Sequence, residues 1–271
     1  MSFTSQKGDE LIELRYGGLR LKVKKSEAFV YYATFVVGEY NKIRLRVDDV
    51  VIDAGANIGD YTVKAASVVK QGKVIAIEPN PYNIEILKQN LVLNKLGNVE
   101  VLNCALSSAN GWGYLAGDTV SASILRGDEN SLNVQTITID DVLGKYCPPD
   151  RDVVLKMDIE GAEELVFSNP IFLERVRELS MELHGERVIK DILVILKKHN
   201  YVVEEFGTGQ LLKNTLVSII RHPASFISAE RKTGKIGFRG FIKTLAGNNP
   251  VPSIGTKSFR LIYARKHQGW V

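Results

Sequence analysis

Short apolar runs alternate along the chain with longer segments of helical periodicity. The apolar runs include DVVIDAG from residue 49, GKVIAIEP from 72, NVEVLNCAL from 98, DVVLKMDIEG from 152, RELSMELH from 177 and YVVEEF from 201. Helical patterns lie between them, at 60 to 70, 81 to 96, 160 to 168 and 186 to 198. This alternation is typical of an α/β fold, in which a mostly parallel sheet is doubly wound with helices on both faces.

The second of these helices has clear start signals. Asn80 provides a cap and Pro81 fits the first turn, and an apolar stripe follows at Ile84, Leu87 and Leu91. Residues 186 to 198 carry a similar stripe.

Three regions depart from the alternation. Residues 1–48 contain short amphipathic, strand-like pieces, which we expect to form a cap segment across the ligand edge of the sheet. Residues 105 to 140 predict a short excursion with an added strand. Residues 207–257 form an insertion with eight Lys or Arg and a single acid, before a closing strand in residues 258–271. The main domain is therefore expected at 49–206 and 258–271.

Composition narrows the function classes only slightly. The 271 residues are 45% hydrophobic with a net charge of +4, as in an ordinary globular protein. No amino-terminal apolar leader and no apolar run of about 20 residues is present, so a cytoplasmic location is expected. Cys104 and Cys147 fit no metal-binding spacing and are expected to be free thiols that face away from the crevice, which argues against a cytosine C5 enzyme.

The first apolar run ends in a candidate cofactor loop, VVIDAGANIGDYT. Asp53 ends the strand, and Gly55 and Gly59 permit a tight turn and close approach of a ligand to the backbone. A dinucleotide site would favour glycine where Asn57 stands, because the main chain must reach a pyrophosphate. Asp53 instead favours a cation such as the sulfonium of S-adenosylmethionine.

Two further polar residues follow neighbouring strands. Glu78 lies 25 positions after Asp53, where an acid can accept hydrogen bonds from both ribose hydroxyls. Asn103 could bond the adenine edge or merely open a turn.

A second polar group follows later strands. Lys156, Asp158 and Glu160 occupy alternate positions at the end of one apolar run, and Glu182 and His184 do so at the end of the next. Because side chains on a strand alternate between faces, each set is expected to project from one side, so that the two sets converge on one rim of the sheet.

Several blocks together resemble the FkbM-type methyltransferase family: VIDAGANIGDYT, IAIEPNPYNIEILKQNLVLN, TIDDVL, LKMDIEGAE and MELHG, over roughly residues 35 to 206. The resemblance implies a class I, Rossmann-like, S-adenosylmethionine-dependent methyltransferase. Such a fold has a seven-stranded sheet with an antiparallel last strand, here preceded by a helical insertion. It also implies methylation of a hydroxyl on a sugar, glycolipid or other small metabolite.

The resemblance carries over a set of cofactor contacts. They are Asp53, Gly55, Asn57, Gly59 and Glu78, and Thr62 and Pro79 lie in the same two blocks. The insertion at residues 207–257 is outside the usual family pattern.

An alcohol is a poor nucleophile until its proton leaves, and the rim residues could promote this loss in two ways. His184 or Asp158 could act as a general base, or Asp158, Glu182 and His184 could hold a divalent cation. A purely structural, hydrogen-bonded role for these groups is the third alternative. Lys156 is expected to keep the acids ionised. Glu160 is kept as a site residue, although an acid there also suits the first turn of a helix.

Other acceptors and roles remain open from the sequence. The basic insertion could track RNA phosphates in a transfer RNA methyltransferase, or bind the inner membrane face through LLKNTLVSII and FRGFIKTL and so reach a lipid-linked sugar. It could also be a lid that packs on the core. A cofactor-binding protein without catalysis is the remaining alternative.

Overall fold

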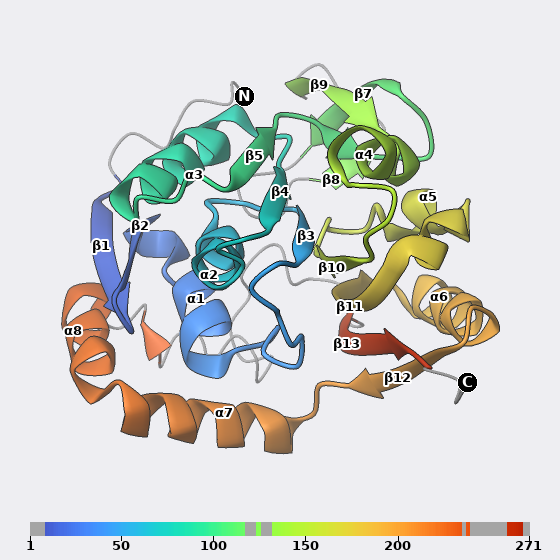
Figure 1. Ribbon diagram of the computed structural model, residues 1–271. Coiled ribbons are helices and arrows are strands. Elements are labelled where there is room, and N and C mark those ends of the chain that lie inside the picture. The colour runs from blue at the N-terminus through green and yellow to red at the C-terminus, as the bar shows by residue number, and fades with distance from the viewer. Residues whose placement is uncertain (1–8, 117–122, 126–131, 235–236, 239–258, 268–271) are drawn as a thin grey trace.

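A seven-stranded sheet forms the centre of the computed structural model, which describes residues 9–116, 123–125, 132–234, 237–238 and 259–267 (Figure 1). Its strands lie in the order β12, β13, β11, β10, β3, β4, β5. Their bounds are Tyr201–Glu205, Phe259–Lys266, Val176–His184, Val153–Met157, Val50–Ala54, Lys73–Ile77 and Val99–Leu102. Only β13 runs antiparallel to its neighbours in this sheet. The predicted class I methyltransferase fold, with its antiparallel last strand, is therefore confirmed.

Helices cover both faces of the sheet. On one face pack α2 (Asp60–Val68) and α3 (Pro81–Leu93), and on the other pack α4 (Ile139–Tyr146), α5 (Glu163–Phe167) and α6 (Glu186–Lys198) (Figure 1). The central strands β3 and β10 are buried along their whole length, as expected for strands with helices on both sides.

The predicted helix boundaries agree closely with the structure. Asn80 caps α3 by accepting a hydrogen bond from the Tyr82 amide at 3.0 Å, and Pro81 occupies the first turn. The helix at 186 to 198 has the predicted limits. The helix expected at 160 to 168 is shorter, because it begins only at Glu163 after a turn.

Between β5 and β10 the chain forms a second, smaller sheet. Its strands are β6 (Ala105–Leu106), β9 (Leu132–Ile137), β7 (Gly111–Ala116) and β8 (Ser123–Leu125), in that order. The sequence predicted one added strand in this region, so most of this sheet was missed.

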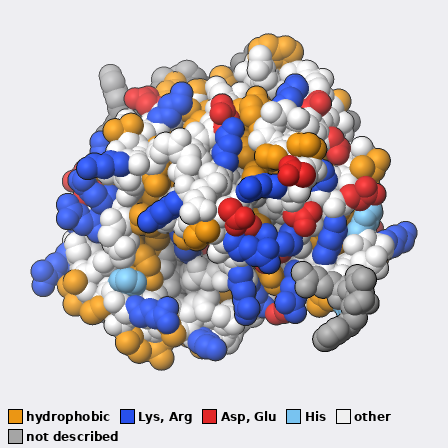
Figure 2. Space-filling model, in the orientation of Figure 1, with side chains coloured by type: hydrophobic (Ala, Val, Ile, Leu, Met, Phe, Trp, Pro, Cys, Tyr) orange, Lys and Arg blue, Asp and Glu red, His pale blue; other side chains and the backbone are white. Residues whose placement is uncertain are grey.

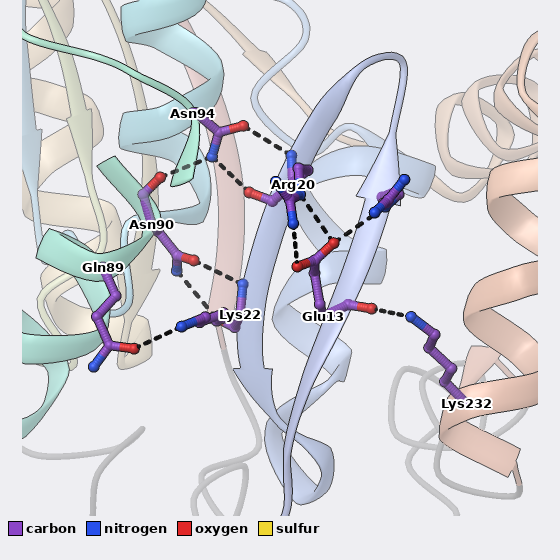
Figure 3. Close-up of polar contacts among 8 residues, drawn as sticks. Glu13, Arg20, Lys22, Gln89, Asn90, Asn94 and Lys232 are labelled. Atoms are coloured by element: carbon purple, nitrogen blue, oxygen red, sulfur yellow. Dashed lines mark hydrogen bonds and ion pairs between the residues drawn. The ribbon is translucent and has the colours of Figure 1, made fainter. Parts of the chain in front are cut away.

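The amino-terminal segment begins as a hairpin of β1 (Leu11–Tyr16) and β2 (Leu19–Lys24). Figure 3 shows how α3 holds the hairpin edge. Asn90 and Asn94, one turn apart, each accept a bond from a β2 amide and donate one to a β2 carbonyl, as a further strand would. The next residues were expected to be strand-like, but 25–37 are helical, with η1 (Lys25–Glu27), α1 (Phe29–Tyr31) and η2 (Tyr32–Val37).

The basic insertion contributes two described helices, α7 (Thr208–Arg221) and α8 (Pro223–Thr233), which lie outside the sheet layers at the lower edge of Figure 1. Another helical turn, η3 (Pro170–Arg175), precedes β11. Most of the second amphipathic pattern, FRGFIKTL, lies outside the described residues. Within the described ranges, no helix is both long enough and apolar enough to cross a membrane.

Candidate functional site

A cavity opens to solvent where β3, β4, β5 and β10 end, and the space in it, counted together with the adjoining solvent, is about 620 Å³. Ligand sites of open α/β sheets lie at this edge, because the carboxyl ends of the parallel strands meet there. Of the predicted cofactor contacts, four line the cavity: Gly55, Asn57, Glu78 and Pro79. Asp158 and Glu160 line it as well, so the cofactor set and part of the polar rim share one cavity.

The loop after β3 depends on Gly55. Its φ is +73°, and a Cβ there would lie 1.7 Å from the main-chain oxygen of Asp158. Only glycine allows β3 and β10 to leave the sheet this close together. Asn57 also has a positive φ, of 50°, and its amide donates a hydrogen bond to Glu78 at 2.8 Å.

Glu78 is held in place by main-chain and side-chain donors. Its carboxylate accepts bonds from the amides of Asn57 and Asn80 and from the side chain of Asn83. Burial raises the pKa of Glu78 to about 7, although these donors oppose the rise. A fixed, buried carboxylate at the wall of the cavity suits a ligand that donates hydrogen bonds, such as a ribose diol.

Asp53 lies behind the cavity instead of lining it. It is fully buried, accepts a 2.5 Å bond from the Thr62 hydroxyl and forms a 3.2 Å ion pair with Lys156. Lys156 also donates to the carbonyl of Gly55 at 2.7 Å. Its nearest carboxylate partner is thus Asp53 on the adjacent strand, and the pair fixes the loop that carries Gly55.

Two more predicted contacts also lie away from the cavity wall. Gly59 begins α2 with a φ of 84°, and a Cβ there would press on Leu87. Asn103 donates to the carbonyls of Glu78 and Pro79 at 3.2 and 2.9 Å. Their direct contact with a cofactor, like that of Asp53 and Thr62, stays a prediction.

The cavity also has an apolar lining. It is formed by Ile77, Cys104, Ala105, Leu106, Leu115, Ile159 and Ala162. The expectation that neither cysteine faces the crevice is wrong for Cys104, because the chain turns directly after β5 and brings this residue into the lining. Both thiols are free, and burial raises the pKa of Cys104 to about 11, so the thiolate is disfavoured.

The rim begins where β10 stops. The strand ends at Met157, before Asp158, and Glu160 has a φ of 51°. Glu160 therefore reaches the cavity through a left-handed turn and not through strand alternation, which was the predicted reason. The hydroxyl of Tyr40 lies 3.5 Å from Oδ2 of Asp158, and the Lys156 ammonium lies 5.4 Å from the Tyr40 ring centroid.

His184 is oriented by a residue that the sequence did not single out. Its Nδ1 lies 3.0 Å from Oε1 of Glu163, whose side chain is completely buried. Nε2 points to the rim, 3.6 Å from Glu160 and 3.7 Å from Glu182. Glu163 lies in the first turn of α5, so its sequence position reads as ordinary helix-dipole compensation.

Three titratable groups on the rim have raised pKa values. Burial lowers the pKa of His184, but the bond and charge of Glu163 and the charges of Asp158 and Glu160 outweigh it and raise the pKa to about 9. Burial and the charge of Asp158 raise the pKa of Glu160 to about 8 and that of Glu182 well above its usual range. The rim therefore favours positively charged or proton-donating ligands.

A metal-binding geometry is present in a slightly different set from the predicted one. Asp158, Glu160 and His184 each offer a ligand atom within 4.8 Å of the others. The predicted set had Glu182 in place of Glu160. Carboxylate and imidazole ligands would suit several divalent cations.

Three more charged residues adjoin the rim and were missed from the sequence. Asp60 accepts a bond from Thr34, and burial raises its pKa to about 6. Burial and the charge of Asp158 raise the pKa of Glu39 to about 8. Lys64 donates to the carbonyl of Thr34, and burial lowers its pKa to about 8. Glu39 lies in the sequence GEY at residues 38–40, a pattern that is typical of a turn and does not indicate a site.

Comparison with known proteins is consistent with this geometry. The methyltransferase FkbM domain matches residues 53–203, which is more than half of the chain. The chain belongs to the FkbM methyltransferase family. It is therefore an S-adenosylmethionine-dependent methyltransferase, as the sequence blocks implied.

Two relatives of this FkbM protein bear functional names. Methyltransferase sdnD of Sordaria araneosa is 31% identical over 52% of this chain and 68% of its own length. Hexuronic acid methyltransferase AglP of Haloferax volcanii is 30% identical over 59% of this chain and 69% of its own length. Among solved structures, a Streptococcus mutans protein in complex with SAH aligns with a TM-score of 0.43, at 12% identity over 88% of this chain and 98% of its own.

The cavity of the FkbM protein fits S-adenosylmethionine. Two buried oxygens of lining residues, Oδ1 of Asn57 and Oδ1 of Asp158, have no hydrogen-bond partner among the described residues. Ribose hydroxyls and the α-ammonium group of the cofactor are donors that could satisfy such oxygens. The apolar wall suits an adenine ring, and the acids of the rim suit a cation.

Proposed function

We propose that the FkbM protein transfers the methyl group of S-adenosylmethionine to a hydroxyl group of a sugar, glycolipid or other small metabolite. The observation that carries this proposal is the His184–Glu163 pair, which presents Nε2 at the rim of the cofactor cavity beside Asp158. A relative named as a hexuronic acid methyltransferase supports a sugar-like acceptor.

The bound cofactor supplies an electrophilic methyl carbon on a sulfonium. The acceptor oxygen forms the new C–O bond as the C–S bond breaks, and the hydroxyl proton must leave. In our proposal Nε2 of the neutral His184 imidazole takes this proton, and the neutral fraction grows as the pH rises toward the pKa of about 9. Glu163 accepts the hydrogen bond from Nδ1, which fixes the tautomer that leaves Nε2 free, and it stabilises the imidazolium that forms.

In our proposal Asp158 and Glu160 bind and orient the two reactants. Their carboxyl groups lie on the cavity wall near His184 and would attract the sulfonium and orient the acceptor hydroxyls by hydrogen bonds. Holding the acceptor oxygen in line with the methyl carbon can supply roughly 7–11 kcal/mol of the barrier reduction. Lys156 and Asp53 support the site from behind the cavity, because their ion pair fixes the turn at Gly55.

Isotope labelling of the product tests this proposal. We would incubate the protein and cell extract with a methyl-labelled donor, separate sugars, lipids, protein and RNA, and identify the labelled species by mass spectrometry. Label on a hydroxyl oxygen of a sugar or small molecule is expected. Label in RNA, or on nitrogen or carbon, would contradict the proposal.

Two variants separate catalysis from binding in the same assay. His184→Asn should retain donor binding by calorimetry but lose 10²- to 10⁴-fold in transfer, the usual contribution of a general base. His199→Asn, at the end of α6, removes a histidine outside the site and should change neither property. Full transfer by His184→Asn would remove His184 from the mechanism.

A further inference from the structure

Helix α7 has its polar and apolar faces in the opposite orientation to that of an ordinary surface helix. Thr215 and Ser218 are buried against the protein, where the Ser218 hydroxyl lies 2.8 Å from that of Tyr16 and donates to the Phe35 carbonyl at 3.4 Å. Asn214 donates to the carbonyl of Gly38 at 3.3 Å. Surface helices normally bury their apolar stripe, whereas α7 buries these hydroxyls beside half-buried Leu211 and leaves several other aliphatic side chains outside.

The outward face of α7 carries those aliphatic side chains in a regular stripe. Leu212, Leu216 and Ile220 are spaced by four residues and are 62%, 60% and 69% exposed, with Val217 beside them. Ile227 on α8 is also exposed, at 51%. Figure 2 shows orange side chains gathered along the lower left edge, over α7 and α8. An apolar surface of this kind marks a binding face.

The charges beside the stripe are of one sign. Lys213, Arg221 and Arg231 are exposed, whereas Glu230 is the only acid in residues 208–234. Glu230 is turned inward, where it accepts bonds from the Tyr32 hydroxyl and the Phe238 amide, both at 2.7 Å. The outer face thus offers aliphatic and cationic groups together, with no exposed acid among the described residues of the two helices.

We propose that α7 and α8 bind the surface of an anionic lipid membrane, with the aliphatic stripe inserted among the acyl chains near the headgroups. A stripe parallel to the helix axis and flanked by Lys and Arg is the pattern of a helix that lies in the membrane plane. A symmetric contact with a second copy is disfavoured, because it would place Lys213 and Arg221 of one chain against those of the other.

The lipid surface would lie close to the catalytic rim. Asn214 of α7 bonds the carbonyl of Gly38, and Tyr40, two residues later, contacts Asp158. The inward face of α7 thus adjoins the segment that reaches the rim, and an acceptor carried by a lipid would be brought to this side of the protein. Delivery of a lipid-linked acceptor rests on the proposed function, whereas binding of α7 and α8 to lipid does not.

Vesicle flotation tests the inference directly. The full chain is mixed with vesicles of phosphatidylcholine alone or with one third phosphatidylglycerol, and the bound fraction is measured against lipid concentration. Binding to the anionic vesicles is expected, and it should weaken with added salt. The variant Lys213→Gln with Arg221→Gln should lose about fivefold in partitioning for each charge removed.

A matched pair of triple variants tests the stripe itself. Leu212→Ser with Leu216→Ser and Ile220→Ser should reduce partitioning at least tenfold. Val92→Ser with Ile171→Ser and Val194→Ser changes three other aliphatic residues, each more than half exposed, and should retain it. Donor binding by calorimetry should be unchanged in both, which shows that they fold and that the result is independent of the methyl acceptor.

Three results would overturn the inference. The first is unchanged partitioning of the α7 triple variant. The second is a wild-type protein that binds neither kind of vesicle, which would leave another segment or partner to cover the face. The third is a wild-type dimer that becomes a monomer in the triple variant by analytical ultracentrifugation, since the stripe would then be a subunit interface.

Discussion

Lys156 and Asp53 form a buried ion pair across two adjacent strands, with Nζ 3.2 Å from Oδ1. Asp53 has no exposed surface, and Lys156 is 5% exposed. Burial lowers the pKa of Lys156, but Asp53, Asp158 and Asp60 outweigh it and hold the pKa above its usual value. Lys156 therefore stays protonated, and its ion pair with Asp53 joins the cofactor strand to the strand that leads to the rim.

Removal of one partner should be costly for stability. Lys156→Met leaves Asp53 buried without its counter-ion, and we expect the free energy of unfolding to fall by about 3–5 kcal/mol. Lys73→Met, which breaks an exposed strand pair with Glu100, should cost less than about 1 kcal/mol. Urea denaturation measures both. Equal losses in the two variants would show that the buried pair has no special role.

The turn at Gly55 should tolerate no side chain. A Cβ 1.7 Å from the Asp158 oxygen forces β3 and β10 apart, so Gly55→Ala should lower both the unfolding midpoint and donor affinity. Gly144→Ala, at an exposed position of helix α4, meets no atom within 4 Å and should stabilise by about 0.5–1 kcal/mol. Thermal unfolding and calorimetry on the pair give the comparison, and a fully stable Gly55→Ala would count against the close approach.

Glu78 should control donor affinity in a pH-dependent way. Its raised pKa of about 7 means that the free protein is increasingly protonated as the pH falls below 7, whereas ribose hydroxyls favour the carboxylate. Affinity for S-adenosylmethionine should therefore rise as the pH increases through 7. Glu78→Gln should bind at least tenfold more weakly and lose this dependence, while exposed Glu85→Gln on α3 should match the wild type. A Glu78→Gln protein with unchanged calorimetric affinity would place the ribose elsewhere.

The fold was largely predictable, because strand and helix periods are local properties of the sequence. The β3 and β4 segments, the cap at Asn80 and the limits of α6 all followed from residues within a few positions of each other. The small sheet of residues 105–137 was mostly missed, since its pairing joins β6 to β9 and β7 to β9 across long intervals. Such pairing leaves little local signal.

The site was predictable only in part, for the same reason. Glu78 and Asp158 follow strands and His184 ends one, so topology alone brings them to one edge. Glu163 and Glu39 reach the rim through a helix start and a turn, and their sequence positions have ordinary structural explanations. Conversely, Asp53 has the sequence position of a ligand contact. Its carboxylate instead forms an ion pair with Lys156, which lies 103 residues later in the chain.

Glu163 should set the proton affinity of His184. In wild type the imidazole is protonated below about pH 9, with Glu163, Asp158, Glu160 and Glu182 facing it. Glu163→Gln removes the charge that stabilises the imidazolium, so the pKa of His184 should fall by about one to two units. NMR titration of the ring measures this shift, and the alkaline rise of kcat/KM should move to lower pH with it. The neighbouring, exposed Glu164→Gln should shift neither, and an unmoved His184 pKa in Glu163→Gln would contradict the pairing.

Metal removal distinguishes a general-base role of His184 from a role as a metal ligand. If His184 acts as the base, dialysis against a chelator should leave turnover unchanged, and added magnesium or manganese should not raise it. Loss of turnover on chelation with recovery on metal addition would instead assign Asp158, Glu160 and His184 as ligands.

The most direct test is a crystal structure with S-adenosylhomocysteine bound. We expect the ribose hydroxyls on Glu78, the adenine against the wall that includes Leu106 and Leu115, and the sulfur directed toward Asp158 and Nε2 of His184. A product molecule bound elsewhere, or a sulfur turned away from His184, would contradict the assignment of this cavity and rim as the methyl-transfer site.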